Sequence, residues 1–247
     1  MHPSLIERDV LLVGGGHAHV LALKQLAMRP QAGVRLTLLS PDPLTPYSGM
    51  LPGLLAGHYT FEETHIDLVR LCAWANARFL TDQVVAFHPQ RNTVLCEKRG
   101  ELEYDLVSFD IGSQPEMDSV AGARQHAIPV KPVSSLWERW QAITSSPPGA
   151  GDAIAVVGGG AGSVELVLAI ANRFGDRQPT LSLHCSAPTV LPGYPRSVSR
   201  RVEAALASAN VQVFCGDRVA RVDANSFTTA AGTQHSFATL LWCTGAA

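Results

Sequence analysis

The feature that most constrains the fold of this chain is an internal repeat. The segment DVLLVGGGHAHVLALKQLA at 9–27 returns as AIAVVGGGAGSVELVLAIA at 153–171, so that Gly14 matches Gly158 with an offset of 144 positions (158 minus 14). The segments at 79–113 and 213–246 are also similar to each other. Repetition of this kind predicts two related structural units in tandem.

Each unit has the pattern strand, glycine turn, helix and second strand. The apolar runs Val10 to Val13 and Ile154 to Val157 precede the glycines, and unbroken apolar strands are typical of a parallel sheet covered on both faces. Later alternation of apolar and polar residues predicts an antiparallel β hairpin, followed by a final apolar strand that ends in glycine. The sequence therefore predicts an α/β fold of two tandem Rossmann-like dinucleotide-binding domains, each with a parallel sheet and an added hairpin.

The domain limits follow from where the repeat begins and ends. We expect a first domain over 1–115, a linker over 116–150 and a second domain over 151–247. The linker contains one expected helix, Val133 to Ile143, and ends in a break rich in Ser, Pro and Gly.

The glycine turns are the candidate binding sites. A strand that ends in glycine and opens a helix places unpaired N–H groups and the positive end of the helix dipole where a pyrophosphate can bind. In G-x-G-x-x-G the third glycine allows close packing of helix and strand, but this position holds His19 in the first turn and Ser163 in the second. We expect Ser163 to fit, and the His19 ring to point away from the sheet, toward the phosphate or solvent.

Two other interpretations of the first turn remain. One is a plain strand-to-helix turn without a ligand, which the second copy makes less attractive. The other is a metal site formed by His17 and His19, which is disfavoured because residues two apart on a helix point to different sides. We therefore expect no metal.

The residues expected to hold the ribose do not settle the choice of nucleotide. An acidic side chain normally follows the second strand, but Ser40 stands there in the first unit and Cys185 with Ser186 in the second, while Asp42 comes two residues late. NAD and NADP are therefore equally compatible with the sequence. Three arginines, Arg196, Arg200 and Arg201, are candidates for a 2′-phosphate contact or for a solvated helix face.

Composition excludes several classes of function. With 46% hydrophobic and 16% charged residues and a net charge of −2, the chain is expected to bury a core and to have no affinity for nucleic acid. Five scattered cysteines, the closest 24 apart (96 minus 72), include no C-x-x-C and indicate reduced thiols in a cytoplasmic protein. No apolar run is long enough for a transmembrane segment.

Several stretches resemble one family of flavoproteins. These are GGGHAHV, SPDPLTPYSGMLPGLLAGHY, HIDL and YDLVSFDIGSQPE. They resemble the pyridine nucleotide-disulfide oxidoreductase superfamily, in which a first domain binds FAD and a second binds NAD(P)H. The greatest resemblance is to the branch associated with selenide, water dikinase, which is itself similar to type II NADH dehydrogenases and sulfide:quinone reductases.

The resemblance implies a set of cofactor-binding residues in each unit. For FAD they are Gly14, Gly16, Ala18, His19, Ser40, Pro46, Tyr47, Ser48, Gly49, Met50, Val84, Gly112 and Ser113, with Thr45 in the same loop. For NAD(P) they are Gly158, Gly160, Ala161, Gly162, Glu165, Thr244 and Gly245. Tyr47 and Met50 would lie against the flavin, although a loop anchored in the core is the alternative for both.

The implied function is hydride transfer from NAD(P)H to FAD and onward to a quinone or a sulfur or selenium acceptor. No catalytic side chain is then required, since the flavin mediates the reaction; Lys131 is either near the rings or solvated. The alternatives are a non-catalytic FAD/NAD(P)-binding module or partner of selenide, water dikinase, and a flavin oxidase or monooxygenase.

The family pattern continues beyond the last residues of this sequence. In such flavoproteins the chain returns to the FAD domain after the NAD(P) domain and then forms a C-terminal domain, so we expect the C-terminal part of the family fold to be missing. Peripheral membrane contact through that part is compatible with the sequence, and the fragment by itself is expected to be less active or inactive.

Overall fold

The computed structural model describes residues 5–146, 149, 151–175 and 179–245. Residues 1, 150 and 247, which bound the expected domains, lie outside this range. Contacts divide the chain into two compact units, Met1–Tyr47 with Glu62–Gly112 and Ser48–Phe61 with Ser113–Ala247. The main boundary, between 112 and 113, lies close to the expected one at 115, but 48–61 and the expected linker both belong to the second unit.

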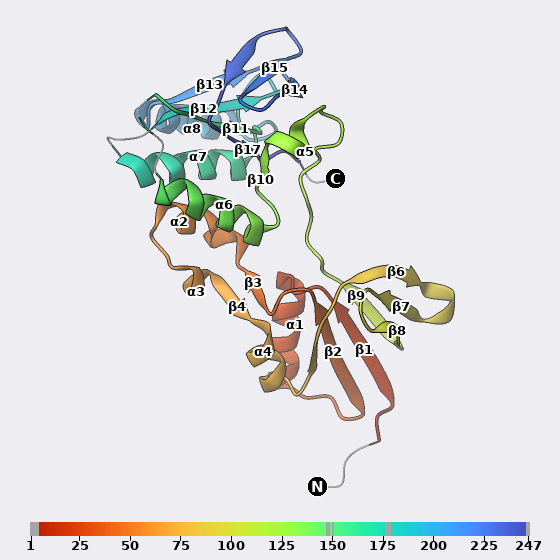
Figure 1. Ribbon diagram of the computed structural model, residues 1–247. Helices are drawn as coiled ribbons and strands as arrows, with labels where there is room; N and C mark the ends of the chain where they lie inside the picture. The colour runs from red at the N-terminus through yellow and green to blue at the C-terminus, as the bar shows by residue number, and fades with distance from the viewer. Residues whose placement is uncertain (1–4, 147–148, 150, 176–178, 246–247) are drawn as a thin grey trace. The chain divides into compact units, whose positions relative to one another are not determined.

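The first unit contains a parallel four-stranded sheet (Figure 1). Its order is β5 (Arg78–Thr81), β2 (Val34–Ser40), β1 (Arg8–Val13) and β9 (Leu106–Phe109). The helices are α1 (His17–Met28) and α4 (Leu68–Trp74), and β3 (Leu44–Pro46) pairs with β4 (His65–Asp67). An antiparallel meander consists of β6 (Val84–His88), β7 (Thr93–Cys96) and β8 (Gly100–Glu103), with the short helix η2 (Pro89–Arg91).

The two faces of strand β1 pack into different cores. Leu12 joins the cluster formed with Leu23 of α1 and Leu68 of α4, whereas Leu11 and Val13 join the cluster under the meander. Alternate side chains of a strand point to opposite faces, so an unbroken apolar run is needed where both faces are covered. The interpretation of this run as a strand buried on both sides is confirmed.

The second unit repeats this plan with a five-stranded parallel sheet. Its order is β10 (Ile128–Pro129), β17 (Thr239–Trp242), β11 (Ala153–Val157), β12 (Thr180–Cys185) and β13 (Val211–Cys215). Its helices include α5 (Ala123–His126), α6 (Val133–Ser145), α7 (Ala161–Phe174) and α8 (Arg196–Ser208). Its meander comprises β14 (Val219–Val222), β15 (Ser226–Thr229) and β16 (Gln234–Ser236).

The repeat is reproduced down to the strand register. Val13 pairs with Leu39 on one side and Phe109 on the other, and Val157 pairs in the same way with His184 and Trp242. The predicted α/β fold with two Rossmann-like units is confirmed, and each expected hairpin is a three-stranded meander.

Segment 48–61 and the expected linker both contribute to the core of the second unit. The segment holds η1 (Ser48–Met50) and α2 (Leu51–Ala56) and ends at the first residue of α3 (Phe61–Thr64). Leu54 and Leu55 are buried in the same cluster as Leu136 and Trp140 of α6, and the Trp140 ring nitrogen donates to the Leu55 carbonyl oxygen at 3.2 Å. The predicted helix at 133–143 is confirmed, and it packs as part of this unit.

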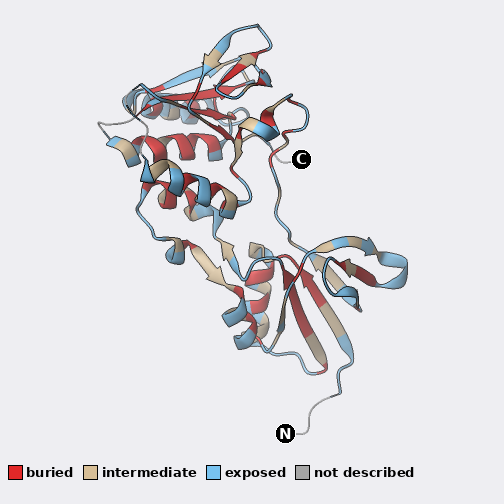
Figure 2. Cartoon of the chain, viewed as in Figure 1, coloured by how far each residue is buried: buried red, intermediate tan, exposed pale blue. Residues whose placement is uncertain are grey.

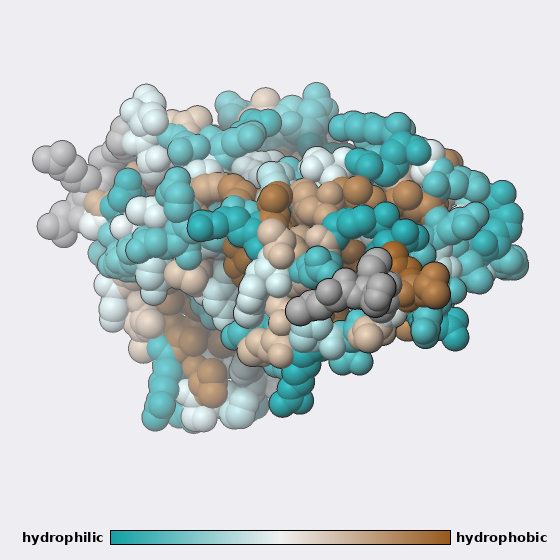
Figure 3. All heavy atoms as spheres, turned by 90° about the horizontal axis from the view of Figure 1, so that it is seen from below, coloured by the Kyte–Doolittle hydropathy of each residue, from teal (hydrophilic) through white to brown (hydrophobic). Residues whose placement is uncertain are grey.

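Buried residues follow the strands and the inner helix faces (Figure 2). The surface also carries apolar side chains, and Figure 3 shows hydrophobic areas between larger hydrophilic ones. In the first unit the exposed ones include Val85, Phe87, Leu106, Phe109 and Ile111. Among the described residues no helix is both long and apolar enough to cross a bilayer.

Replacement of Leu136 by Ala tests the core that α6 helps to form. Leu136 is fully buried, and removing its side chain should lower the free energy of unfolding by about 3 kcal/mol because the remaining cavity adds to the lost burial. Urea unfolding followed by circular dichroism measures this loss. Arg139→Ala, at an exposed position of the same helix, serves as the control. Equal losses of unfolding free energy in both variants would contradict the packing of Leu136 in this core.

Candidate functional site

The first glycine of each turn allows the closing strand to approach. Gly14 has φ +94°, and a Cβ added there would lie 2.3 Å from the carbonyl oxygen of Asp110. Gly158 has φ +141°, and the corresponding distance to the Cys243 carbonyl oxygen is 2.1 Å. Any side chain would collide at both positions, and the backbone conformation favours glycine, so each turn is fixed against the end of β9 or β17.

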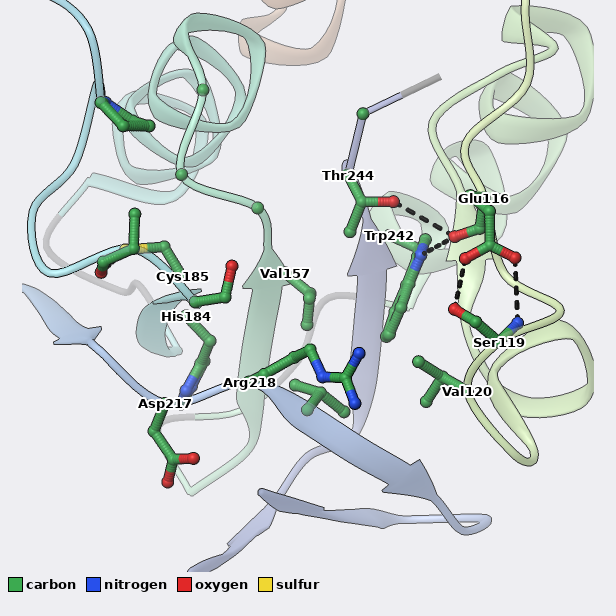
Figure 4. A pocket seen from close by; sticks show the side chains of 18 residues that line it. Glu116, Ser119, Val120, Val157, His184, Cys185, Asp217, Arg218, Trp242 and Thr244 are labelled. Atoms are coloured by element: carbon green, nitrogen blue, oxygen red, sulfur yellow. Dashed lines mark hydrogen bonds between the residues drawn. The ribbon is translucent and has the colours of Figure 1, made fainter. Parts of the chain in front are cut away.

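A pocket of about 320 Å³ lies beside the turn of the second unit (Figure 4). It is at the carboxyl edge of the parallel sheet, where doubly wound proteins bind ligands. Its lining residues are Glu116, Ser119, Val120, Val157, Gly158, Gly159, Gly160, His184, Cys185, Ser186, Ala187, Pro192, Asp217, Arg218, Val219, Trp242, Thr244 and Gly245.

The second glycine of this turn, Gly160, leaves space at the beginning of α7. No atom lies within 4 Å of a Cβ added to Gly160, which is the N-cap residue of this 14-residue helix. The first N–H groups of a helix have no partner inside it, so this part of the pocket suits an anionic group such as a pyrophosphate.

One wall of the pocket is held together by hydrogen bonds to Glu116. Its carbonyl oxygen accepts from the Trp242 ring nitrogen at 2.8 Å and from the Thr244 hydroxyl at 3.2 Å. Its carboxylate accepts from the hydroxyl and the backbone N–H of Ser119, and these bonds lower the pKa of Glu116. The expected closing turn, Thr244 and Gly245, is thereby fixed at the pocket.

The opposite wall contains His184, Cys185 and Asp217, with Arg218 drawn between the two walls (Figure 4). Asp217 accepts from the Ala231 N–H at 3.2 Å, and its hydrogen bond with Thr229, together with backbone bonds, lowers the pKa of Asp217. The pocket therefore presents two carboxylates and one guanidinium.

The His184 ring is packed among aromatic rings under the pocket. It stacks on Phe214 with ring centroids 4.7 Å apart, and its Nε2 lies 3.0 Å from the Ser182 hydroxyl. Burial lowers the pKa of His184 to about 4, and the charge of His235 adds to this effect. The ring is therefore neutral at physiological pH.

The predicted residues of the second unit divide into two groups. Gly158, Gly160, Thr244 and Gly245 line the pocket, whereas Ala161, Gly162 and Glu165 lie in the first turns of α7, outside the lining. Arg196, Arg200 and Arg201 are exposed on α8 and are not part of it.

Sequence reasoning missed several pocket residues. Asp217, Arg218 and Trp242 stand at the carboxyl ends of β13 and β17, a position that could have identified them. Glu116 and Ser119 carry no such signal.

In the first unit, a carboxylate occupies the equivalent place. Asp110 Oδ2 accepts from the Ala18 N–H at 2.8 Å and the His19 N–H at 3.3 Å, at the first turn of α1. A Cβ added to Gly16 would lie 2.2 to 2.3 Å from the Asp110 carboxylate atoms. Asp110 was not predicted as a site residue. The equivalent position of the second unit holds Cys243, which is uncharged.

The expectation for the His19 ring is wrong. His19 is only 3% exposed, and its ring lies between the turn and strand β9, with Nδ1 donating to the Gly14 carbonyl oxygen at 2.7 Å and Nε2 2.9 Å from the Ser108 hydroxyl. The ring fits because Ser108 is small where the second unit has Leu241. Both ring nitrogens are therefore engaged inside the protein. Ser163, which is also fully buried, donates to the Cys243 carbonyl oxygen at 3.1 Å.

Three other predicted FAD residues of the first unit, Ser40, Thr45 and Tyr47, lie near this turn. A Cβ added to Gly15 would lie 3.5 Å from both the buried Ser40 hydroxyl and Thr45. The Tyr47 ring lies 4.6 Å from the His17 ring, and Pro46 is the last residue of β3. Val84 begins β6, and Gly112, with φ +73°, has open space around it.

The remaining predicted FAD residues belong to the second unit. Ser48, Gly49 and Met50 form η1. The Ser113 hydroxyl accepts from the Lys131 ammonium at 3.3 Å, so Lys131 lies near one predicted residue but is exposed.

A family model decides the relationship of this chain. The model described as "Pyridine nucleotide-disulphide oxidoreductase" matches residues 8–247. The chain belongs to this family. Among solved structures, NDH2 from Plasmodium falciparum in complex with NADH superposes on this family member with a TM-score of 0.85 at 17% identity, over 98% of this chain and 56% of NDH2.

Two curated relatives match this chain over only part of their own length. The alternative NAD(P)H-ubiquinone oxidoreductase C1 of Arabidopsis thaliana is 25% identical over 228 residues, which are 84% of this oxidoreductase-family chain and 44% of the relative. The sulfide-quinone reductase of Aquifex aeolicus is 26% identical over 106 residues, 42% of this chain and 24% of the relative. The chain thus spans about half the length of the first relative and of NDH2.

Acid should destabilise the second unit through His184. Its folded-state pKa, about 4, lies below the unfolded value of about 6.5, so protonation favours the unfolded chain as the pH falls between these values. The expected loss is about 3 kcal/mol by pH 4. It is measured as the difference in urea stability between the wild type and His184→Phe at pH 7 and pH 4. His58→Phe, at an exposed position of the same unit, should lose as much stability between pH 7 and pH 4 as the wild type. An equally large loss in His184→Phe would show that His184 is not the group responsible.

Proposed function

We propose that this chain is the nucleotide-binding part of an FAD-dependent NAD(P)H oxidoreductase. The observation that carries the proposal is the pocket of about 320 Å³ beside the open turn at Gly160, which we assign to NAD(P)H. The names of the relatives support it, since one is an NAD(P)H-ubiquinone oxidoreductase and NDH2 was solved with NADH.

The second unit has the chemistry required for a dinucleotide. The beginning of α7 at Gly160 offers the place for the pyrophosphate, and Arg218 adds a positive charge to the pocket. At the carboxyl end of β12 stand Cys185 and Ser186 in place of the acidic residue that usually binds the ribose of NAD, and the two carboxylates of the pocket, Glu116 and Asp217, come from other segments. The proposal therefore covers both nucleotides.

The first unit is assigned to FAD, on condition that Asp110 moves. FAD would accept the hydride from the nicotinamide and pass electrons onward. Gly14 and Gly16 would hold its pyrophosphate, with Ser40 at the ribose and Tyr47 near the flavin. In the present geometry the Asp110 carboxylate takes the Ala18 N–H that an incoming phosphate would need, so the side chain must rotate away.

The electron acceptor is proposed to be a small molecule. A quinone is supported by the names of both curated relatives, and a sulfur acceptor by the name of a solved neighbour in fold, a NAD-dependent persulfide reductase from A. fulgidus. The comparisons give no support to selenide, water dikinase as a partner or to a selenium acceptor.

A non-catalytic nucleotide-binding module is the second candidate function, and the position of the Asp110 carboxylate at the first turn of α1 favours it.

Gly160→Val tests the nucleotide pocket. A Cβ added at this position meets no atom within 4 Å and the backbone is extended, with φ −83° and ψ 176°, so the valine variant should fold normally but fill the space for the pyrophosphate. We expect NADH and NADPH affinity to fall at least tenfold, as measured by isothermal titration calorimetry. Gly151→Val, at another position with open space, should bind like the wild type. Unchanged affinity in Gly160→Val would contradict the proposed pocket.

Asp110→Asn tests the FAD assignment. Removal of one negative charge beside the phosphate should raise the FAD affinity of the apoprotein roughly tenfold, which corresponds to about 1.4 kcal/mol. Quenching of flavin fluorescence measures it. Glu97→Gln changes the charge equally at an exposed position of the same unit and should have no effect. Weaker binding in Asp110→Asn would mean that the carboxylate maintains the turn, and absence of FAD binding in every variant would remove the assignment itself.

A further inference from the structure

Two cysteines that are 30 residues apart meet at the end of the second sheet. Strands β12 and β13 are parallel neighbours, and Cys185 is the register partner of Cys215. Register partners on neighbouring strands point to the same face of a sheet. The two Sγ atoms lie 2.9 Å apart, and both side chains are free thiols.

The spacing of the two cysteines meets the distance requirements of a disulfide. Neighbouring strands are about 4.8 Å apart, within the range of roughly 4.4 to 6.8 Å found between the Cα atoms of bonded cysteines. The sulfurs need to approach by only about 0.9 Å to reach the bonding distance of about 2.05 Å. The other cysteines are elsewhere: Cys72 and Cys96 in the first unit, and Cys243 after β17.

We propose that Cys185 and Cys215 form a reversible disulfide, which makes the wall of the second-unit pocket a redox-sensitive modification site. Cys215 is partly exposed and belongs to β13, which is an edge strand of the sheet. Cys185 is 3% exposed and lines the pocket. The more accessible thiol therefore meets the oxidant first, and the buried one completes the bond.

The step balances with a hydroperoxide as the oxidant. The Cys215 thiol gives up its proton and its sulfur attacks the outer peroxide oxygen, the O–O bond breaks, and a sulfenic acid forms while the other oxygen takes up that proton and leaves as water or an alcohol. The Cys185 sulfur then attacks the sulfenic sulfur, its proton leaves with the hydroxyl as water, and the S–S bond forms. The two thiols lose two electrons in total, and the peroxide gains them.

Oxidation would also change the loop that follows β12. The Cys185 thiol donates to the Ala187 carbonyl oxygen at 3.2 Å, and burial, with the Cys215 hydrogen bond as the next contribution, raises the pKa of Cys185, which keeps this thiol protonated. A disulfide has no S–H to donate. Ser186 and Ala187 line the pocket, so the bond changes the pocket at their position.

Peptide mapping tests the disulfide directly. The full chain is treated with hydrogen peroxide, alkylated and digested with trypsin without reduction, which separates the two cysteines into peptides 178–196 and 202–218. We expect these two peptides to be linked, and the link to disappear with dithiothreitol. The link should persist in Cys72→Ser and be absent in Cys185→Ser and Cys215→Ser. Failure to find it in the folded wild type, or equal linkage of other cysteine pairs, would overturn the proposal.

The effect on the pocket is measured separately and rests on the proposed function. Oxidised wild type should bind NADH three- to tenfold more weakly than reduced wild type, with recovery after reduction, while peroxide should have no such effect on Cys215→Ser. Equal NADH affinity of the linked and reduced proteins would overturn the effect on the pocket. If the reduced protein binds no nucleotide, the proposed function fails, and the peptide map still decides the disulfide.

Discussion

The close approach of a closing strand to the first glycine of each turn is the constraint on which both units depend. The carbonyl oxygens of Asp110 and Cys243 lie where a side chain on Gly14 or Gly158 would have to stand. This contact brings the end of β9 or β17 against the beginning of α1 or α7. The side chains at the strand ends therefore determine what each turn can accept.

The two copies of the turn have diverged at those strand ends. In the second unit Cys243 carries no charge, and the space at Gly160 is open. In the first unit Asp110 places a negative charge on the same side of the helix, close to Gly16, and Ser108 leaves room for His19. The same backbone thus gives one turn that is ready for an anion and one in which a resident carboxylate must first be displaced.

The sequence predicted the repeat, the two parallel sheets and helix α6, because long apolar runs and glycine turns are local signals. It did not predict the buried ring of His19, which depends on the size of Ser108, 89 positions away. The same reason applies to the contact of Cys185 with Cys215, since the register of parallel strands cannot be read from the spacing of cysteines. Asp110 was overlooked because its role requires a distance to Gly16 rather than a motif.

The packing of α2 has a consequence for how the chain folds during synthesis. All four strands of the first sheet have been made by residue 109, whereas the apolar side chains of Leu51, Leu54 and Leu55 find their core with residues that lie beyond 129. Until those residues leave the ribosome, this short helix exposes apolar surface, the condition in which nascent chains aggregate or recruit chaperones. Neither sequence repeat is therefore self-contained: α2 of the first repeat packs into the core of the second unit, and the second sheet takes β10 from the segment between the repeats.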